Sequence, residues 1–263
     1  MRPRPHLILT LGRSGSNFLV NAINQADAAV NFGEVLGGWT APWKLHDRLG
    51  ATTDAAAYLD AFYDSPVRYY ATLAGGNAMR LRNGRPVSWP RRGAQFTVGT
   101  KDFAHVFEAR GIASYAAMRD DLFVIGLVRE NTVRRVLSAV IMQHTRVAAA
   151  TRTMRTPTVA IDPADFERDL AVFEAETKQL RAQLARVPSN RKLTLTYEAL
   201  FANPVSTHAA LRQAYDALGL RFRGQSSDHK KIVNRPLRKV IANYDELSER
   251  IVGTRFADQL AEA

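Results

Sequence analysis

The chain has 263 residues, of which 46% are hydrophobic and 23% charged, as expected of one globular domain over residues 1–263, and the absence of cysteine excludes disulfides and thiolate chemistry. No apolar run reaches the length of about 18 residues that a transmembrane helix needs, so we expect a cytoplasmic protein with at most peripheral membrane contact. The net charge of +11, from 36 basic and 25 acidic residues, would suit a polyanionic cofactor. The sequence has no zinc-finger, RNP-type or basic-zipper pattern, so we expect no nucleic-acid partner.

Residues 7–24 predict a strand, a glycine turn and a helix in that order. The apolar run at 7–11 is too short for a signal peptide and is typical of a buried strand, and helical spacing begins at about 14–16. Backbone N–H groups and the helix dipole would converge on one anion there, although a merely tight turn remains the alternative. The predicted phosphate ligands are Gly12, Arg13, Ser14, Gly15, Ser16 and Asn17. Neither GxxxxGK[ST] nor GxGxxG fits the loop.

Residues 32–95 predict an irregular region that covers the substrate. We expect a helix at 54–63 and loop structure over 66–95, where glycines and prolines recur. All three tryptophans, Trp39, Trp43 and Trp89, fall in this region. Their rings could stack on a sugar or a base, or pack beneath the loops.

The remaining elements alternate between strands and helices. We expect strands at 95–99, 121–128 and 192–196, and helices at 102–118, 132–147, 162–187, 207–218 and after residue 244. This order predicts an α/β fold, a three-layer sandwich with a mainly parallel central sheet. Ligands of such sheets bind at the carboxyl ends of the strands, so Lys101 and Arg129 should face one cleft.

The sequence Arg13-Ser14-Gly15-Ser16 after the first strand resembles the 5′-phosphosulfate loop of PAPS-dependent sulfotransferases. The arginine makes it similar to the bacterial carbohydrate type, such as the nodulation-factor and trehalose sulfotransferases. Segments 122–140, 193–204 and 229–260 extend the resemblance in the right order. The resemblance implies a P-loop-NTPase-like fold, PAPS as donor, PAP as product, no required metal, and a carbohydrate or glycolipid acceptor. It leaves homo-oligomerisation open.

The resemblance also implies how the 3′-phosphate of the donor is held. The family places an arginine at a strand end and a serine on the next helix, and Arg129 and Ser138 resemble that pair with one extra residue between them. Arg134 and Arg135 are nearby substitutes. The basic stretch with Arg238 and Lys239 is similar to a C-terminal segment that adds contacts to this phosphate, whereas Tyr197 and Glu198 resemble architectural residues of the family.

Sulfuryl transfer needs a general base for the acceptor hydroxyl and a cation for the leaving phosphate. The resemblance assigns these roles to Glu34 and Arg13, with His105 or His46 as alternative bases. Lys101 would bind substrate or sulfate, or form a salt bridge with a neighbouring carboxylate. A non-catalytic nucleotide- or anion-binding protein, with its basic surface for nucleic acid, is the alternative function. A kinase is weaker because the P-loop lysine is missing.

Overall fold

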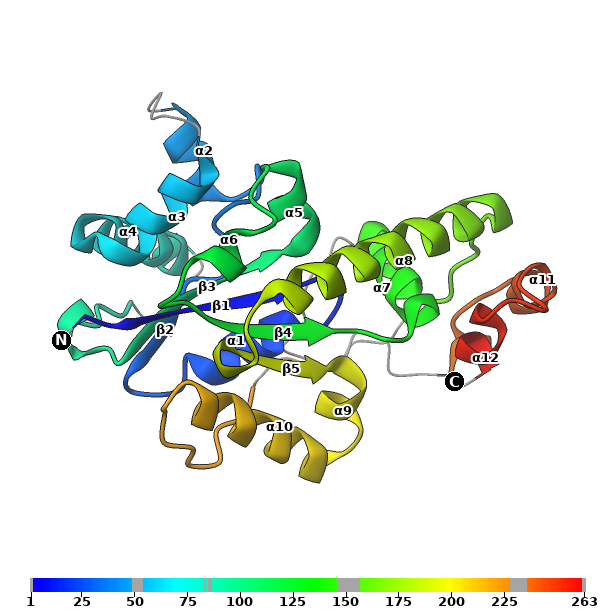
Figure 1. The fold of residues 1–263 in the computed structure, drawn as a ribbon. Coiled ribbons are helices and arrows are strands. Elements are labelled where there is room, and N and C mark those ends of the chain that lie inside the picture. Colours follow the sequence, from blue (N-terminus) through cyan, green and yellow to red (C-terminus); the bar gives the residue numbers. More distant parts are fainter. Residues whose placement is uncertain are drawn as a thin grey trace.

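The computed structural model describes residues 2–48, 54–82, 84, 87–145, 157–227 and 236–261. At its centre is a five-stranded, all-parallel sheet in the order β2-β3-β1-β4-β5 (Figure 1). The strands are β1 Arg4–Thr10, β2 Ala29–Asn31, β3 Thr97–Phe103, β4 Phe123–Val128 and β5 Lys192–Thr196. The predicted α/β class with a parallel sheet is confirmed.

Helices cover both faces of this sheet, above and below it in Figure 1. Alternating residues of β1 enter different cores: Leu7 and Leu9 pack with α3, α5, α6 and the end of α8, whereas Ile8 packs with α1 and α10. The helices of the described residues are α1 Ser16–Ile23, α2 Ala41–Arg48, α3 Ala55–Asp64, α4 Pro66–Arg82, α5 Ala104–Ala109, α6 Tyr115–Met118, α7 Thr132–Thr145, α8 Pro163–Arg186, α9 Tyr197–Phe201, α10 Pro204–Ala217, α11 Tyr244–Arg250 and α12 Phe256–Ala261. Within the described ranges, no helix has the length and apolar character needed to cross a bilayer.

A third apolar cluster fixes α7, whose first residues lie next to the carboxyl ends of the strands. Val133, Val136 and Leu137 of this helix pack against Phe166 of α8 and Leu247 of α11. The C-terminal segment therefore holds the helix that follows β4 in place.

Local signals for α8 are strong, and the structure confirms them. The side chain of Asp162 accepts hydrogen bonds from the N–H groups of Ala164 and Asp165, with Pro163 in the first turn. The strand predicted at 192–196 is confirmed as β5.

Four features of the first half of the chain differ from the predictions. Residues 66–82 form α4, not a loop, and a short strand, β2, occurs where no strand is predicted. The strand predicted at 95–99 runs on to Phe103, and the single helix predicted at 102–118 is two short helices with Gly111 between them at φ 71°. Glycine adopts this left-handed conformation without the steric strain that other residues have there, so it commonly ends a helix.

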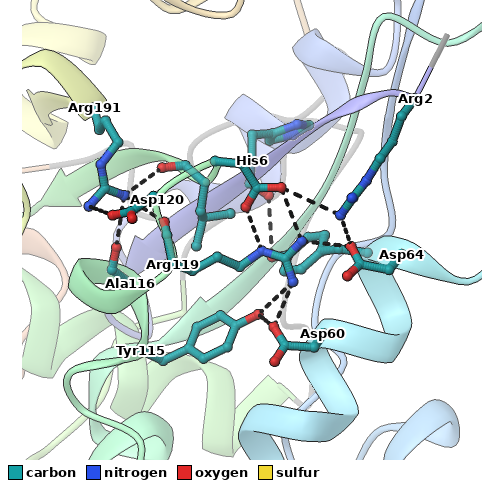
Figure 2. A network of polar contacts seen from close by, with 12 residues as sticks. Arg2, His6, Asp60, Asp64, Tyr115, Ala116, Arg119, Asp120 and Arg191 are labelled. Atoms are coloured by element: carbon teal, nitrogen blue, oxygen red, sulfur yellow. Dashed lines mark hydrogen bonds and ion pairs between the residues drawn. The ribbon is translucent and has the colours of Figure 1, made fainter.

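At the amino-terminal edge of the sheet, an arginine ties α3 to the β4 side of the fold (Figure 2). The guanidinium of Arg119 donates to Asp60 at 2.6 Å, Asp64 at 2.7 Å and Asp121 at 2.8 Å. Tyr115 donates its hydroxyl to Asp60 at 2.8 Å in the same network. Because the arginine side chain is only 11% exposed, these bonds are shielded from water better than most surface ion pairs.

We expect Arg119→Met to lower the free energy of unfolding by about 2 kcal/mol, because three carboxylates lose their shared donor. Urea unfolding measures the change. Arg168→Met is the matched control, since this exposed arginine pairs with Asp165 and Asp169 of its own helix, and we expect no measurable change. Equal effects of the two substitutions would contradict the assignment.

Candidate active site

The five strands end at one edge of the sheet, and a predicted functional residue or a close neighbour follows each end (Figure 1). In spatial order across the sheet these residues are Glu34 after β2, His105 after β3, Arg13 after β1, Arg129 after β4 and Tyr197 after β5. The parallel topology therefore gathers residues that lie far apart in the sequence.

The loop between β1 and α1 has the backbone of an anion-binding turn. Arg13 and Gly15 are left-handed, at φ 65° and 79°, with Ser14 between them at negative φ. Such alternation turns successive N–H groups toward one concave side, and α1 begins directly afterwards. Ser16 is buried in the first turn of that helix and Asn17 is exposed.

The predicted role of the Ser14 side chain needs correction. Its hydroxyl is completely buried, donates to the carbonyl of Leu11 at 2.7 Å and lies 2.6 Å from the hydroxyl of Thr10. Thr10 in turn donates to the carbonyl of Leu127 at 2.8 Å. The serine thus ties the loop to β4, and any contact of Ser14 with an anion would come from its backbone N–H.

Both the small space around residue 15 and its left-handed backbone conformation require glycine. A Cβ atom there would lie 2.6 Å from Phe201 and 3.1 Å from Tyr197, and φ is left-handed. We expect Gly15→Ala to lower the free energy of unfolding by about 1–3 kcal/mol. Gly12→Ala is the control, because a Cβ there meets no described atom within 4 Å, and we expect a change within about 0.5 kcal/mol in thermal unfolding. Equal destabilisation would contradict this reading of the loop.

Two arginines meet at this loop from different strand ends. Arg129, only 4% exposed, donates to the carbonyl of Arg13 at 2.7 Å, and its guanidinium lies 4.1 Å from the ring centre of Tyr197. The Nε of Arg13 donates to the hydroxyl of Ser138 on α7 at 3.0 Å. The structure thus places Arg13 next to both Arg129 and Ser138. The assignment of Arg129 and Ser138 to the 3′-phosphate, and of Arg13 to the leaving phosphate, stays a prediction.

The electrostatics of this pair favour an anion between its members. Burial, together with the charges of Arg134 and Arg13, lowers the pKa of Arg129 to about 10, against the opposing effect of Tyr197 and Glu198. Burial also lowers the pKa of Arg13. The Nε of Arg129 is buried and has no hydrogen-bond partner among the residues that the structure describes. A bound phosphate would supply both the missing acceptor and the missing negative charge.

Arg135 is buried and bonded to the loop after β1, so it is not available to replace Ser138 as a ligand. It donates to the carbonyl of Gly12 at 2.8 Å and to that of Phe173 at 2.9 Å, and it forms an ion pair with Glu176 of α8. Its side chain is 1% exposed. Sequence analysis does not identify Glu176. The helical periodicity of α8 indicates which side chains face outward but not which residues they contact.

Glu34 and Lys101 form an ion pair at the same edge, on the side of β2 and β3. Trp39 also donates its indole N–H to the Glu34 carboxylate at 2.6 Å. The Lys101 ammonium lies 4.6 Å from the ring centre of Phe103. This pair is one of the alternatives that the sequence leaves open for Lys101, whereas the tryptophan contact has no local sequence signal.

The two candidate histidines lie in different surroundings. The ring of His105 is partly exposed, stacks on Phe103 and has its Nδ1 3.5 Å from Glu176. His46 is buried in the aromatic cluster with Trp43 and Tyr58, so its burial does not support the role of alternative base.

The three tryptophans are likewise divided between surface and core. Trp43 is 3% exposed and packs in the core, whereas Trp39 and Trp89 are each 55% exposed. Trp39 donates a hydrogen bond to Glu34, whereas the contact of Trp43 with His46 lies in the core. The sugar-stacking role therefore stays a prediction for Trp39 alone at this edge.

The C-terminal basic residues point elsewhere. Arg238 is 67% exposed and pairs with Asp245 at 2.8 Å, and Lys239 is exposed beside it. In the described part of the chain, no contact joins either to the loop after β1 or to Arg129. Their predicted part in the phosphate site is therefore not supported, and residues 228–235 of the same stretch lie outside the described residues.

Backbone amides at the start of α7 are already bound by side chains. Glu198 accepts the N–H groups of Glu130 and Asn131, each at 3.1 Å, which is the architectural role that the sequence predicts. Gln259 of α12 accepts the N–H of Thr132 at 2.6 Å. These amides are therefore not available to an anion, which leaves the start of α1 as the candidate site at this edge.

Comparison with known proteins identifies the family of this chain. The model of the Sulfotransferase family matches residues 5–224. Solved structures similar to the chain include a sulfotransferase from Alicyclobacillus acidocaldarius, at 15% identity and TM-score 0.45, covering 99% of this chain and 94% of that one. The sulfotransferase domain of the Synechococcus PCC 7002 olefin synthase is 17% identical, with TM-score 0.43 and coverage of 84% and 75%. A sulfotransferase domain of the curacin biosynthetic pathway is 14% identical, with TM-score 0.45 and coverage of 84% and 76%.

No curated protein sequence matches the chain. The family model, however, spans most of its length, from β1 to beyond α10. The chain belongs to the sulfotransferase family.

Proposed function

We propose that the protein transfers a sulfuryl group from PAPS to a hydroxyl of a carbohydrate or glycolipid. The observation that carries the proposal is the pairing of two sites on one sheet edge. Buried Arg13 and Arg129 meet at the loop after β1, and the Glu34–Lys101 ion pair lies at the end of β2 and β3. An anion site next to a carboxylate is the arrangement that base-assisted transfer to a hydroxyl requires.

The residues around the loop after β1 fit the phosphates of the donor. Arg129 has an unsatisfied buried Nε, and Gly12 faces a space that no described atom fills. Arg13 and Arg129, with the backbone N–H groups from Gly12 to Ser16, would hold these phosphates. When bound, PAPS supplies a sulfuryl group whose leaving phosphate gathers negative charge.

Each residue then has one task. The guanidinium of Arg13 binds the leaving phosphate and neutralises its charge. The carboxylate of Glu34 takes the proton of the acceptor hydroxyl, while Lys101 and Trp39 keep that carboxylate in place. The acceptor oxygen gains the bond to sulfur that the phosphate oxygen loses. His105 is the alternative base, oriented by Glu176.

A sugar acceptor is supported by the aromatic side chains beside Glu34. The ring centre of Trp39 lies 6.1 Å from that of Phe103, and the ring of Phe103 stacks on that of His105 with 5.5 Å between the ring centres. Aromatic faces pack well on the C–H surface of sugar rings, and the carboxylate among them can accept a hydroxyl proton.

Calorimetric titration with PAP, beside ATP and AMP, tests the donor site. We expect micromolar binding of PAP and much weaker binding of ATP, followed by sulfate transfer in a screen of carbohydrate and glycolipid acceptors. A failure to bind PAP would refute the assignments of Arg13, Arg129 and Ser138 together. PAP binding without transfer to any acceptor would instead favour a non-catalytic nucleotide-binding protein.

A further inference from the structure

A carboxylate that is completely buried lies beneath the residues that follow Glu34. Asp102 of β3 has 0% exposure, and its oxygens accept hydrogen bonds from two backbone N–H groups. Val35 donates at 3.2 and 3.3 Å, and Leu36 donates at 3.2 Å. Two consecutive amides of one loop therefore converge on a single charged side chain from the neighbouring strand.

The same stretch of β3 holds Glu34 from the other side. The N–H of Lys101 donates to the carbonyl of Gly33 at 2.9 Å, and the ammonium of Lys101 pairs with the Glu34 carboxylate. Residues 33–36 are thus fixed at every residue by either Lys101 or Asp102. Lys101 holds the side chain of Glu34, and Asp102 holds the backbone that sets where this side chain begins.

We propose that Asp102 is a positioning residue for the general base: by accepting the amides of Val35 and Leu36, its carboxylate places Glu34 beside Lys101 and the acceptor hydroxyl. The inference rests on the proposed function, in which Glu34 takes the hydroxyl proton. Asp102 itself is buried beneath the loop and would touch neither acceptor nor donor.

The charge of Asp102 does not serve stability. Burial raises its pKa to about 7, although the amides of Val35 and Leu36 and the charge of Lys101 act in the opposite direction. A carboxyl whose pKa is higher in the folded than in the unfolded state stabilises the fold at low pH, and this stabilisation is lost as the pH rises from about 4 to about 7. Above that range the ionised group opposes folding.

The other titratable groups that face this carboxyl do not relieve this cost. Glu34 raises the pKa of Asp102, and Tyr58 and Tyr63, whose own pKa values are raised by burial and further by Asp102, lie near it. Lys101 is the cation that faces it among the described residues, and Lys101 is already paired with Glu34. The N–H groups of Val35 and Leu36 are therefore the described contacts that stabilise the negative charge of Asp102.

Asp102→Asn provides the test, because asparagine keeps one acceptor oxygen but not the charge. We expect kcat to fall by about 10-fold or more, since displacement of a reacting group by about 1 Å can cost as much as 10²-fold. The Kd of PAP should stay within about 2-fold, and the thermal midpoint at pH 8 should equal or exceed that of the wild type. Unchanged kcat would overturn the proposal, as would a joint loss of thermal midpoint and PAP affinity.

A double mutant separates this inference from the proposed function. If Asp102 acts only through Glu34, Asp102→Asn should cause no further loss of kcat in the Glu34→Gln background. A further 10-fold loss there would mean that Asp102 acts by another route. Full activity of Glu34→Gln alone would refute the base assignment itself, whatever Asp102→Asn does.

A wild-type measurement keeps the test open if Asp102→Asn does not fold. Amide hydrogen exchange, corrected for the intrinsic pH dependence, should show protection of Val35 and Leu36 falling as the pH is lowered through about 7. The N–H of Phe32, which donates to the carbonyl of Gly99 at 2.9 Å, is the matched control and should not change. Equal behaviour of the three amides would overturn the proposal.

Discussion

Glu34→Gln is expected to lower kcat by about 10²–10⁴-fold, because glutamine cannot take the proton of the acceptor hydroxyl. The substitution preserves the size of the side chain and an oxygen for Lys101, so it isolates the loss of basicity. The amide would place a second donor against the indole N–H of Trp39, which is a local cost at an exposed position. Steady-state sulfate transfer at saturating donor measures the change.

The matched control is Glu130→Gln, at an exposed glutamate that pairs with Arg181 of α8. We expect its turnover to be the same as that of the wild type. PAP should bind both variants with unchanged affinity, because no described contact joins either residue to the loop after β1. If Glu34→Gln keeps more than about a tenth of wild-type turnover, the general base is another group, and His105 is then the residue to replace.

Elements with a complete local signal could be predicted from the sequence. The strand β4 is a near-continuous apolar run, and α8 begins with an aspartate cap followed by proline. Both signals come from residues that are adjacent in the sequence, so the prediction of these two elements does not depend on tertiary contacts.

The elements that sequence analysis missed are defined by distant partners. β2 has three residues, and its pairing with β3 makes it a strand. α4 contains Gly75 and Gly76, which favour a loop, yet Tyr69 packs its helix against Phe32. In each case tertiary contacts outweigh weak or opposing local propensity.

The same distinction applies to the candidate site. Strand ends are readable from hydrophobic patterns, so Lys101 and Arg129 could be placed at one edge. The role of Glu34 comes from the family resemblance alone, because the short strand before it has no sequence signal. The direction of a side chain is not readable in this way. Ser14 turns into the core because Thr10 and the carbonyl of Leu11 offer it partners there.

Arg129→Lys is expected to weaken PAP binding by about 10–100-fold in calorimetric titration. Arginine presents a planar fork that binds phosphate through two parallel bonds, whereas lysine offers one compact charge. One nitrogen of Arg129 is committed to the carbonyl of Arg13, and its Nε is buried without a described partner. Lysine would keep the charge but could not serve the loop carbonyl and the phosphate together.

Arg238→Lys is the matched control, because the sequence places this arginine in the same phosphate site and the structure pairs it with Asp245. We expect its affinity for PAP to stay within about 2-fold of the wild type. Thermal unfolding of both variants separates lost binding from lost folding. If the two substitutions weaken PAP binding equally, the C-terminal basic stretch contributes to the phosphate site as the resemblance implies. If neither weakens it, the phosphate does not lie at the end of β4, and the paired arginines of this sheet edge need another ligand.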